Sequence, residues 1–405
     1  MKIKISEVKF VEDLYPRKGI DPEMVNQYSL NLDALPPIVV TEDLTLVDGY
    51  HRLVAYRNDG REEIETKIIK CPQERILYEA TRRNALHGKQ LTIGEKRHLA
   101  AIFFKEGLRE VQIAKVLALG KSTVSEWLKN KKHEAEKERN ERILDLYLAC
   151  KTQREIAHKI GLNQGQIARI MQKFVDELSK KLPTPESLEI YNIWNFSKCD
   201  RRYGLDYPGR IPGQIVENVL YYYTQTFDLV VDPMAGGGTT IDVCKAMIRR
   251  YLAYDINPVR EDIKRWDIAK GFPKETKNCD LIFLDPPYWR LQRGGYSEKS
   301  VSNATYGEWL AFMGKLAKDS YKTVKKEGHV VLLLTPFLDE KVTNSFLDLP
   351  FKCFPFFKGF TEVQRVSVPM PSQIKSVQDI EYAKEKRILL DLNRDLIIFR
   401  KEKHA

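Results

Sequence analysis

The sequence has little that would mark a disulfide-bonded, secreted or membrane-embedded protein. Its six cysteines are scattered and none forms a C-x-x-C pair, so neither a zinc site nor a disulfide framework is suggested. No apolar run approaches the roughly 18 residues that span a bilayer. The first residues, Met1–Ile5, lack the apolar core of a signal peptide. We therefore expect a cytoplasmic protein with no bound metal and no membrane contact.

Negative charge is scarce in one part of the chain. The whole sequence has a net charge of +10. Residues 89–173 hold 18 Lys and Arg against 10 Asp and Glu, so this segment accounts for most of the excess. A basic surplus confined to one segment indicates a polyanionic partner.

Two strand-like apolar runs end in an acid at a sharply turning loop. Residues 279–284 lead into two consecutive prolines, which neither a strand nor a helix can accommodate. Residues 227–231 lead into a glycine-rich loop that is followed by a helical pattern. Open α/β sheets bind their ligands at such strand ends. The two loops read Asp285-Pro286-Pro287-Tyr288 and Asp232-Pro233-Met234-Ala235-Gly236-Gly237-Gly238-Thr239-Thr240.

Together the loops resemble those of the S-adenosylmethionine-dependent DNA amino-methyltransferases, whose signatures are D-P-[FM]-[AC]-G-x-G-T-[TL] and [DNS]-P-P-[YFW]. The resemblance implies a Rossmann-like sheet that binds S-adenosyl-L-methionine at the first loop. Glycine would let the backbone turn sharply and approach the methionine and ribose without a Cβ in the way. Asp255 lies at the interval expected of a ribose-binding acid, and Asp267 resembles the acid that meets the adenine amino group. The expected cofactor-binding residues are Asp232, Pro233, Ala235, Gly236, Gly238, Thr239, Asp255 and Asp267.

The resemblance makes Asp285, Pro286, Pro287 and Tyr288 the catalytic loop. The Asp285 carboxylate and the Pro286 carbonyl would accept the hydrogens of a base's amino group, directing its lone pair at the sulfonium methyl. Tyr288 would stack on a base that has left the duplex.

An Asp in first position favours adenine N6 as the target, with cytosine N4 as the alternative. The glycine loop precedes the catalytic loop, whereas many Asp-Pro-Pro-Tyr enzymes have the reverse order. Two further alternatives are an RNA or protein methyltransferase and a non-catalytic ParB-like partition protein.

Other parts of residues 183–405 follow the family less closely. Segment 210–213 would touch the methionine end of the cofactor, and segment 191–196 would be an entry strand or a clamp. The loop 290–306 would cover the site or touch DNA. A helix over 308–324 and a strand over 329–334 are expected next. Residues 386–391 and 393–400 resemble terminal hairpin strands, with Arg394 and Asp395 in structural roles.

Residues 1–88 read as a small α/β domain. A strand ends at Asp48-Gly49, and a helix begins with His51 and Arg52 in its first turn. This resembles the ParB/sulfiredoxin-like fold, in which the motif cradles nucleotide phosphates. Here the two side chains either bind such a phosphate or serve only as local hydrogen-bonding groups.

Two helix-turn-helix patterns lie between these domains. In the first, residues 111–117 and 121–129 flank a turn in which Gly120 permits the tight bend. In the second, residues 152–160 and 164–174 flank Gly161, and Thr152 with Glu155 forms a capping box. Double-stranded DNA is therefore the expected partner. The candidate DNA contacts are Lys121, Ser122, Thr123, Ser125, Gln164, Gln166 and Arg169.

The sequence thus predicts an α/β protein with a Rossmann-like, doubly wound methyltransferase sheet. A small ParB-like α/β domain and an all-α helix-turn-helix segment precede it. The expected boundaries are 1–88, 89–182 and 183–405, and no oligomeric state is indicated.

Overall fold

The computed structural model describes residues 1–86, 91–180, 183–196, 198–289, 301–339, 345–370 and 376–403. Contacts divide the chain into two compact units, Met1–Glu138 and Arg139–Ala405. This division falls inside helix α6 (Lys121–Leu148), and the boundaries at 88 and 182 stay predictions. Within the described ranges, no helix is long and apolar enough to cross a membrane.

The first unit begins with a four-stranded sheet in the order β1-β4-β2-β3. Strands β2 and β4 are parallel, and the other two pairs are antiparallel. The core beneath helices α1 and α2 includes Ile38, Val40 and Leu53. The predicted α/β fold of this segment is confirmed. Its elements are β1 (Lys2–Lys4), α1 (Pro22–Ser29), β2 (Ile38–Thr41), β3 (Leu46–Asp48), α2 (Tyr50–Asn58) and β4 (Glu63–Ile69).

A helical group completes the first unit, with helices where the apolar spacing predicts them. Leu99 and Phe103 of α4 pack against Ile113 of α5 and Val124 of α6. The left-handed residue of the turn is Ala118, with φ of 50°, and not Gly120 as expected. The group consists of α3 (Ile76–Leu86), α4 (Ile93–Lys105), α5 (Glu110–Leu117) and the first part of α6.

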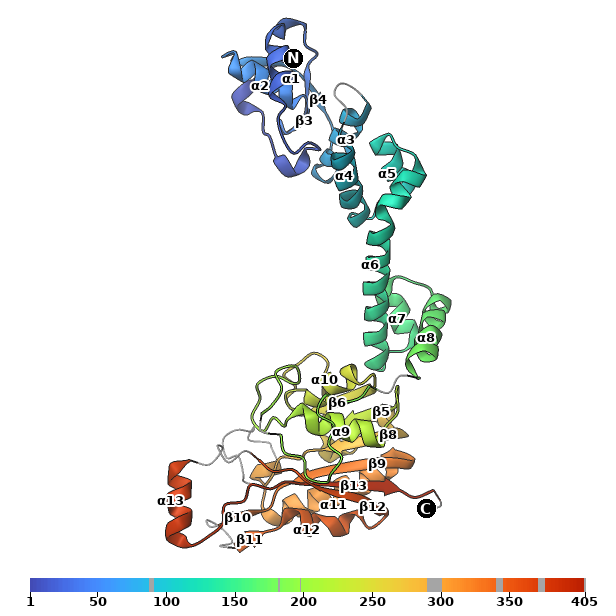
Figure 1. The fold of residues 1–405 in the computed structure, drawn as a ribbon, viewed down its shortest axis with the longest axis vertical. Helices are drawn as coiled ribbons and strands as arrows, with labels where there is room; N and C mark the ends of the chain where they lie inside the picture. The colour runs from blue at the N-terminus through green and yellow to red at the C-terminus, as the bar shows by residue number, and fades with distance from the viewer. Residues whose placement is uncertain are drawn as a thin grey trace. The chain divides into compact units, whose positions relative to one another are not determined.

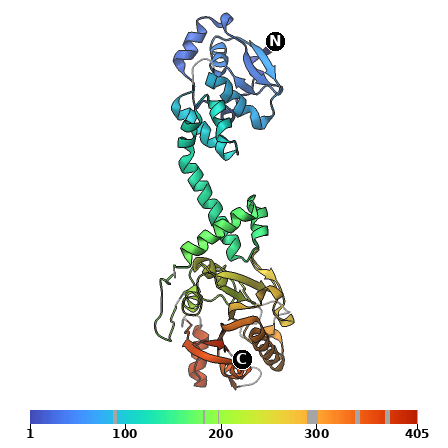
Figure 2. The same cartoon turned by 90° about the vertical axis from the view of Figure 1, so that its right-hand side faces the viewer.

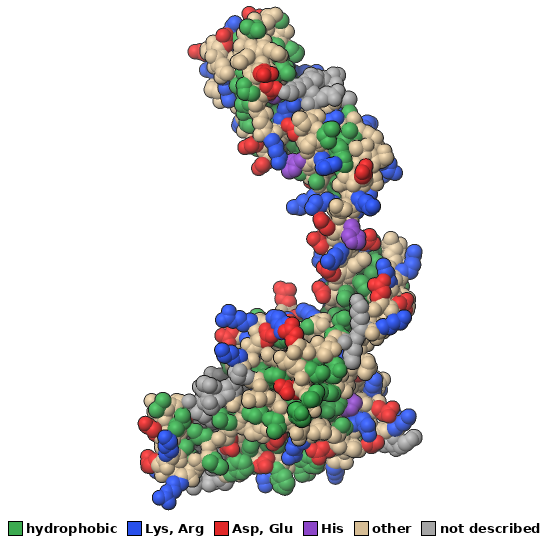
Figure 3. Space-filling model, in the orientation of Figure 1, with side chains coloured by type: hydrophobic (Ala, Val, Ile, Leu, Met, Phe, Trp, Pro, Cys, Tyr) green, Lys and Arg blue, Asp and Glu red, His purple; other side chains and the backbone are tan. Residues whose placement is uncertain are grey.

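The second unit begins with a second helical group, formed by the end of α6, α7 (Gln153–Ile160) and α8 (Gln164–Leu178). Ile143, Ile156 and Ile167 form its buried core. The predicted capping box of Thr152 and the left-handed Gly161 are both present. On the face seen in Figure 3, basic and acidic side chains are intermixed over the helices and form no single basic stripe.

A seven-stranded sheet carries the rest of the second unit, in the order β12-β13-β9-β8-β5-β6-β7. Strand β13 is antiparallel to both of its neighbours, and the strands from β9 to β7 are parallel. The order reverses between β5 and β8, so the sheet is doubly wound, as predicted. Its strands are β5 (Leu229–Asp232), β6 (Arg250–Asp255), β7 (Lys264–Arg265), β8 (Cys279–Leu284), β9 (Val324–Leu334), β12 (Phe360–Ser367) and β13 (Asp395–Lys401).

Helices cover both faces of this sheet because its strand residues alternate between two cores (Figures 1 and 2). One core contains Val230 and Phe283 beneath α9 (Gly213–Tyr223) and α10 (Thr239–Ala246). The other contains Val231 and Leu284 beneath α11 (Tyr306–Thr323) and α12 (Leu349–Cys353).

The terminal hairpin differs from the prediction. Strand β13 is present, but its hairpin partner is β12, and residues 386–391 form no strand. Helix α13 (Val377–Lys386) ends where that strand was expected to begin, and residues 387–391 are a turn and irregular backbone. The helix stands off the sheet in Figure 1. The Ser376 cap and the acidic first turn explain the start of this helix, whereas the strand over 386–391 was expected only from the family resemblance. Segment 191–196 contributes a single bridge, from Ile193 to Ser367 at the edge of β12.

Candidate active site

A cavity of about 650 Å³ opens at the carboxyl ends of the parallel strands, where the strand order reverses. Asp232 is the last residue of β5, Asp255 is the last of β6, and Asp285 directly follows β8. All three carboxyl groups line the cavity. Residues about fifty positions apart in the sequence thus meet at one site because parallel strands place their ends together.

Asp232 is the most deeply buried of these acids, with 6% of its surface exposed. It accepts a hydrogen bond from the Met234 N–H at 3.0 Å. Burial raises the pKa of Asp232 to about 7. A hydrogen bond from Thr240 opposes the shift, and the neighbouring Asp285 and Asp255 add to it. No Lys or Arg forms an ion pair with Asp232 in the part of the chain that the structure describes.

Asp255 and Asp267 each accept hydrogen bonds from nearby backbone. The two Asp255 oxygens accept the N–H groups of Gly236 at 3.0 Å and Asn257 at 2.8 Å. The first of these bonds joins the end of β6 to the glycine loop. Asp267 accepts the Ala269 N–H at 3.0 Å and so caps a short 3-10 turn on the cavity wall.

Burial raises the pKa of Asp285 to about 6, and the positive charge of Arg394 opposes the shift. Arg394 is itself only 6% exposed. The Tyr288 hydroxyl donates to Asp285 Oδ1 at 3.0 Å. In this structure, therefore, Tyr288 contacts the acid and does not face the cavity as a stacking surface.

Two tryptophans fix the loop that carries Asp285. The Trp309 indole N–H donates to the Pro287 carbonyl at 3.1 Å, and the Trp289 indole N–H donates to the Ala304 carbonyl at 2.9 Å. The Pro286 carbonyl accepts no hydrogen bond from the residues described.

Most of the predicted cofactor residues line the cavity, and part of the predicted catalytic loop does. Gly238, Pro286 and Tyr288 do not line it. Gly238, with φ of 84°, caps helix α10 instead. The predicted residues on the cavity wall are Asp232, Pro233, Ala235, Gly236, Thr239, Asp255, Asp267, Asp285 and Pro287.

The glycines of the loop make room for the protein's own side chains. A Cβ on Gly236 would lie 2.9 Å from the Tyr207 ring, and a Cβ on Gly238 would lie 2.6 Å from Arg260 Nη1. The expected close approach of a ligand to this loop stays a prediction. Tyr207 and Arg260 were not among the site residues predicted from the sequence. The only signal for Tyr207 was its place in a Tyr-Pro-Gly turn beside the segment 210–213.

Only part of the segment 210–213 lies on the cavity wall, and its contact with the cofactor stays a prediction. Arg210 lines the cavity, and its guanidinium donates to the backbone carbonyls of Asp200 and Tyr203, the latter at 2.6 Å. Gly213 lies against the Tyr203 ring and is not on the cavity wall. Of the loop 290–306, residues 290–300 lie outside the described residues, whereas Val301, Asn303 and Ala304 line the cavity.

The candidate DNA contacts lie on two separate helical groups. Lys121, Ser122, Thr123 and Ser125 are in the first turns of α6 and are exposed or partly exposed. Gln164, Gln166 and Arg169 are exposed on α8. Gln166 also accepts the Asn163 N–H at 3.1 Å in a capping box, so its side-chain oxygen already serves the helix.

His51 and Arg52 are engaged within their own domain. His51 Nε2 accepts the Asp21 N–H at 3.0 Å, and burial lowers the His51 pKa, which keeps the ring neutral. Arg52 donates to the carbonyls of Pro36 at 2.6 Å and Pro37 at 2.8 Å, and to Asp48 at 2.9 Å. These contacts favour the local hydrogen-bonding alternative over a phosphate site.

The sequence is similar to known proteins over parts of its length. The model of the DNA methylase family of N6/N4 methyltransferases matches residues 95–265, a range that contains Asp232 and Asp255 and ends before Asp285. The transcriptional regulator NovG of Streptomyces niveus is 32% identical over 112 residues, which are 27% of this chain and 35% of that protein. The type II methyltransferase M.BglII of Bacillus subtilis is 29% identical over 89 residues, 22% of this chain and 24% of that protein. The chain thus spans about a third of the length of NovG and about a quarter of the length of M.BglII.

Among solved structures, the C-terminally truncated chromosome-partitioning protein ParB from Caulobacter crescentus, complexed to its centromeric parS site, is 18% identical. The similarity covers 44% of this chain and 94% of that chain with a TM-score of 0.27, which is too low to support an inference. Residues 95–265, about two fifths of the chain, are thus similar to the N6/N4 DNA methylase family.

Proposed function

We propose that the second unit binds S-adenosyl-L-methionine and transfers its methyl group to the exocyclic amino group of a base in DNA. The observation that carries the proposal is the meeting of Asp232, Asp255 and Asp285 around one cavity at the strand reversal of a doubly wound sheet. The match of residues 95–265 to the DNA methylase family supports it.

The residues of the cavity fit this cofactor. S-adenosylmethionine has a sulfonium and an ammonium group, and Asp232 is a buried acid without a cationic partner in the described residues. The Asp255 carboxylate accepts two backbone N–H bonds and keeps lone pairs for the ribose hydroxyls. Arg210, on the same wall, suits the cofactor's carboxylate.

The bound cofactor would supply an electrophilic methyl group, and the chain would make the amino group a better nucleophile. The lone pair of an exocyclic amino group is conjugated with the base ring. The Asp285 carboxylate and the Pro286 carbonyl, both acceptors, would bind the two amino hydrogens and draw the nitrogen toward tetrahedral geometry. Since Trp309 and Trp289 fix this loop, the acceptors are pre-organised and need not reorient.

Within this proposal the target is adenine N6, because Asp stands first in the catalytic loop, and cytosine N4 is the alternative. Helices α5–α6 and α7–α8 would hold the duplex through exposed side chains such as Lys121 and Arg169. The base would leave the stack to enter the cavity.

Incubation of the full chain with methyl-labelled S-adenosylmethionine and duplex DNA tests the proposal. Digestion to nucleosides separates N6-methyladenine, the expected product, from N4-methylcytosine. Asp285→Ala is the matched control, which should bind cofactor and transfer nothing. Label in RNA with none in any duplex DNA, or no cofactor binding at all, would refute the proposed function.

A further inference from the structure

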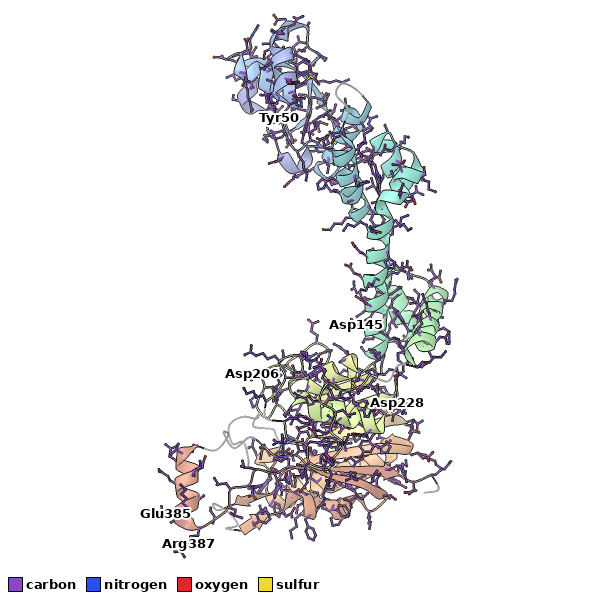
Figure 4. The ribbon with its side chains drawn as sticks, in the orientation of Figure 1. Tyr50, Asp145, Asp206, Asp228, Glu385 and Arg387 are labelled. Atoms are coloured by element: carbon purple, nitrogen blue, oxygen red, sulfur yellow. The ribbon has the colours of Figure 1, made fainter. Side chains whose placement is uncertain are left out.

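Residues 204–207, here named the strap, lie directly on the glycine loop. The Leu205 N–H donates to the Gly237 carbonyl at 2.9 Å. A Cβ on Gly204 would lie 2.4 Å from Thr239 Oγ1, and a Cβ on Gly237 would lie 2.9 Å from Tyr207 Cβ. The two backbones therefore touch with no space for a side chain between them. Asp206 of the strap is labelled in Figure 4, at the side of the unit away from Asp228 at the start of β5.

An arginine outside the cavity holds the strap in place. Asp242 of α10 accepts the Gly204 N–H at 2.8 Å. The same carboxylate accepts two hydrogen bonds from Arg260, at 2.8 and 2.7 Å. Arg260 donates two more to Asp262, at 2.9 and 2.8 Å. Such bidentate pairs are strong and directional, and the Arg260 side chain is only 16% exposed.

Arg260 also contacts the glycine loop itself. Its Nη1 lies 3.4 Å from the carbonyls of Gly237 and Gly238. One guanidinium thus joins three parts of the chain: helix α10, the glycine loop and the segment after β6. Only a glycine at 238 leaves room for it.

The strap forms one wall of the cavity. Tyr207 lines the cavity together with Asp255, and its ring lies over Gly236. Arg260, Asp242 and Asp262 do not line the cavity. Any effect of Arg260 on a bound molecule must therefore pass through the strap or the glycine loop.

We propose that Arg260 is a positioning residue for the cofactor. Its pairing with Asp242 keeps the strap on the glycine loop and Tyr207 on the cavity wall, and so sets how tightly the cofactor is bound. This inference rests on the proposed function, because it assumes that the cavity holds S-adenosylmethionine.

The test compares Arg260→Lys and Asp242→Asn with a matched control, Lys245→Met. Lys245 pairs with Asp262 at 3.1 Å and, among the residues described, contacts neither the strap nor the glycine loop. Titration calorimetry with S-adenosylhomocysteine should show binding weakened about tenfold or more in the first two variants and within about twofold of wild type in the control. In turnover assays, KM for S-adenosylmethionine should rise by a similar factor while kcat stays nearly constant.

A further variant distinguishes an effect that acts through the strap from a general loss of structure. Tyr207→Ala removes the wall residue itself, so Arg260→Lys added to it should weaken binding little further. The inference would be overturned if the effects of the two substitutions on the free energy of S-adenosylhomocysteine binding were fully additive. It would also be overturned if a folded Arg260→Lys variant bound S-adenosylhomocysteine as tightly as wild type does. Failure of the wild-type chain to bind S-adenosylhomocysteine would instead refute the proposed function.

Discussion

Replacing Asp232 by asparagine should stabilise the protein at alkaline pH and impair cofactor binding. Asp232 is buried at the end of β5 without a cationic partner in the described part of the chain. An asparagine keeps the Oδ1 atom that accepts the Met234 N–H but carries no charge. The substitution therefore removes a buried negative charge with little change in shape.

The magnitude follows from the pKa of Asp232, which burial raises from 3.8 to about 7. A carboxyl group whose pKa rises on folding contributes stability that is complete below its unfolded pKa and is lost as pH rises through its folded pKa. Between about pH 5.5 and about pH 8 this loss is on the order of 2 kcal/mol. The asparagine of the variant does not titrate, so this part of the pH dependence should vanish.

Thermal unfolding of the full chain at about pH 5.5 and about pH 8 measures the effect. The relevant transition is the one that S-adenosylhomocysteine shifts upward. For a unit of this size, a change of about 2 kcal/mol moves Tm by roughly 4–8 °C. The matched control is Asp206→Asn, which removes an exposed carboxylate from the same unit and should leave the pH dependence of Tm unchanged.

Parallel pH dependence of Tm in wild type and Asp232→Asn would refute the reasoning, since Asp232 would then ionise freely in the fold. The same variant should bind S-adenosylhomocysteine at least about tenfold more weakly, because the carboxylate that faces a cationic ligand is lost. Unchanged affinity would remove Asp232 from the proposed site.

Three other predictions concern catalysis and DNA binding. The methyl-transfer rate at saturating cofactor should fall as pH drops through about 6, because a protonated Asp285 is a weaker acceptor for the amino hydrogens of the base than the carboxylate; a flat pH–rate profile contradicts this. Trp309→Phe, which removes the bond to Pro287, should lower kcat about tenfold and leave the Kd of S-adenosylhomocysteine unchanged. Arg169→Ala should weaken DNA affinity and reduce the slope of log K against log salt by about 1, whereas Lys173→Ala, which removes the partner of Glu177, is the control.

The outcomes that would contradict the last two predictions are also distinct. A loss of S-adenosylhomocysteine binding in Trp309→Phe would mean that Trp309 supports the whole cavity rather than the catalytic loop. The slope of log K against log salt can be measured by fluorescence anisotropy on the same duplex. Equal slopes for Arg169→Ala and wild type would exclude a phosphate contact by Arg169.

Strands and helix starts with strong local signals could be predicted from the sequence. The apolar run 279–284 and the two prolines after it define β8 and its end, because prolines cannot continue a strand. Thr152 and Glu155 define the start of α7 through side chains that bond to neighbouring backbone. Capping boxes and strand-ending prolines depend on a few adjacent residues, so they can be recognised in a single sequence.

Contacts between distant segments could not be predicted in the same way. The contact of Tyr207 with Gly236 and the pairing of Arg260 with Asp242 join parts of the chain that no local pattern connects. The left-handed turn residue is Ala118 although Gly120 is the better intrinsic choice, so the packing of α5 against α6 overrides propensity there.

Strand β6 fixes the distance between the second helical group and the cavity. Its first residue, Arg250, donates to Cys150 Sγ at 3.7 Å and lies over the ring of Tyr147, next to the end of α6. Its last residue, Asp255, lines the cavity. Six residues of strand make a rigid spacer of about 17 Å between these ends, equivalent to about five base pairs of duplex at about 3.4 Å each. If α7–α8 holds DNA as proposed and the duplex runs parallel to β6, the sequence that it contacts and the base that enters the cavity are separate positions along the duplex.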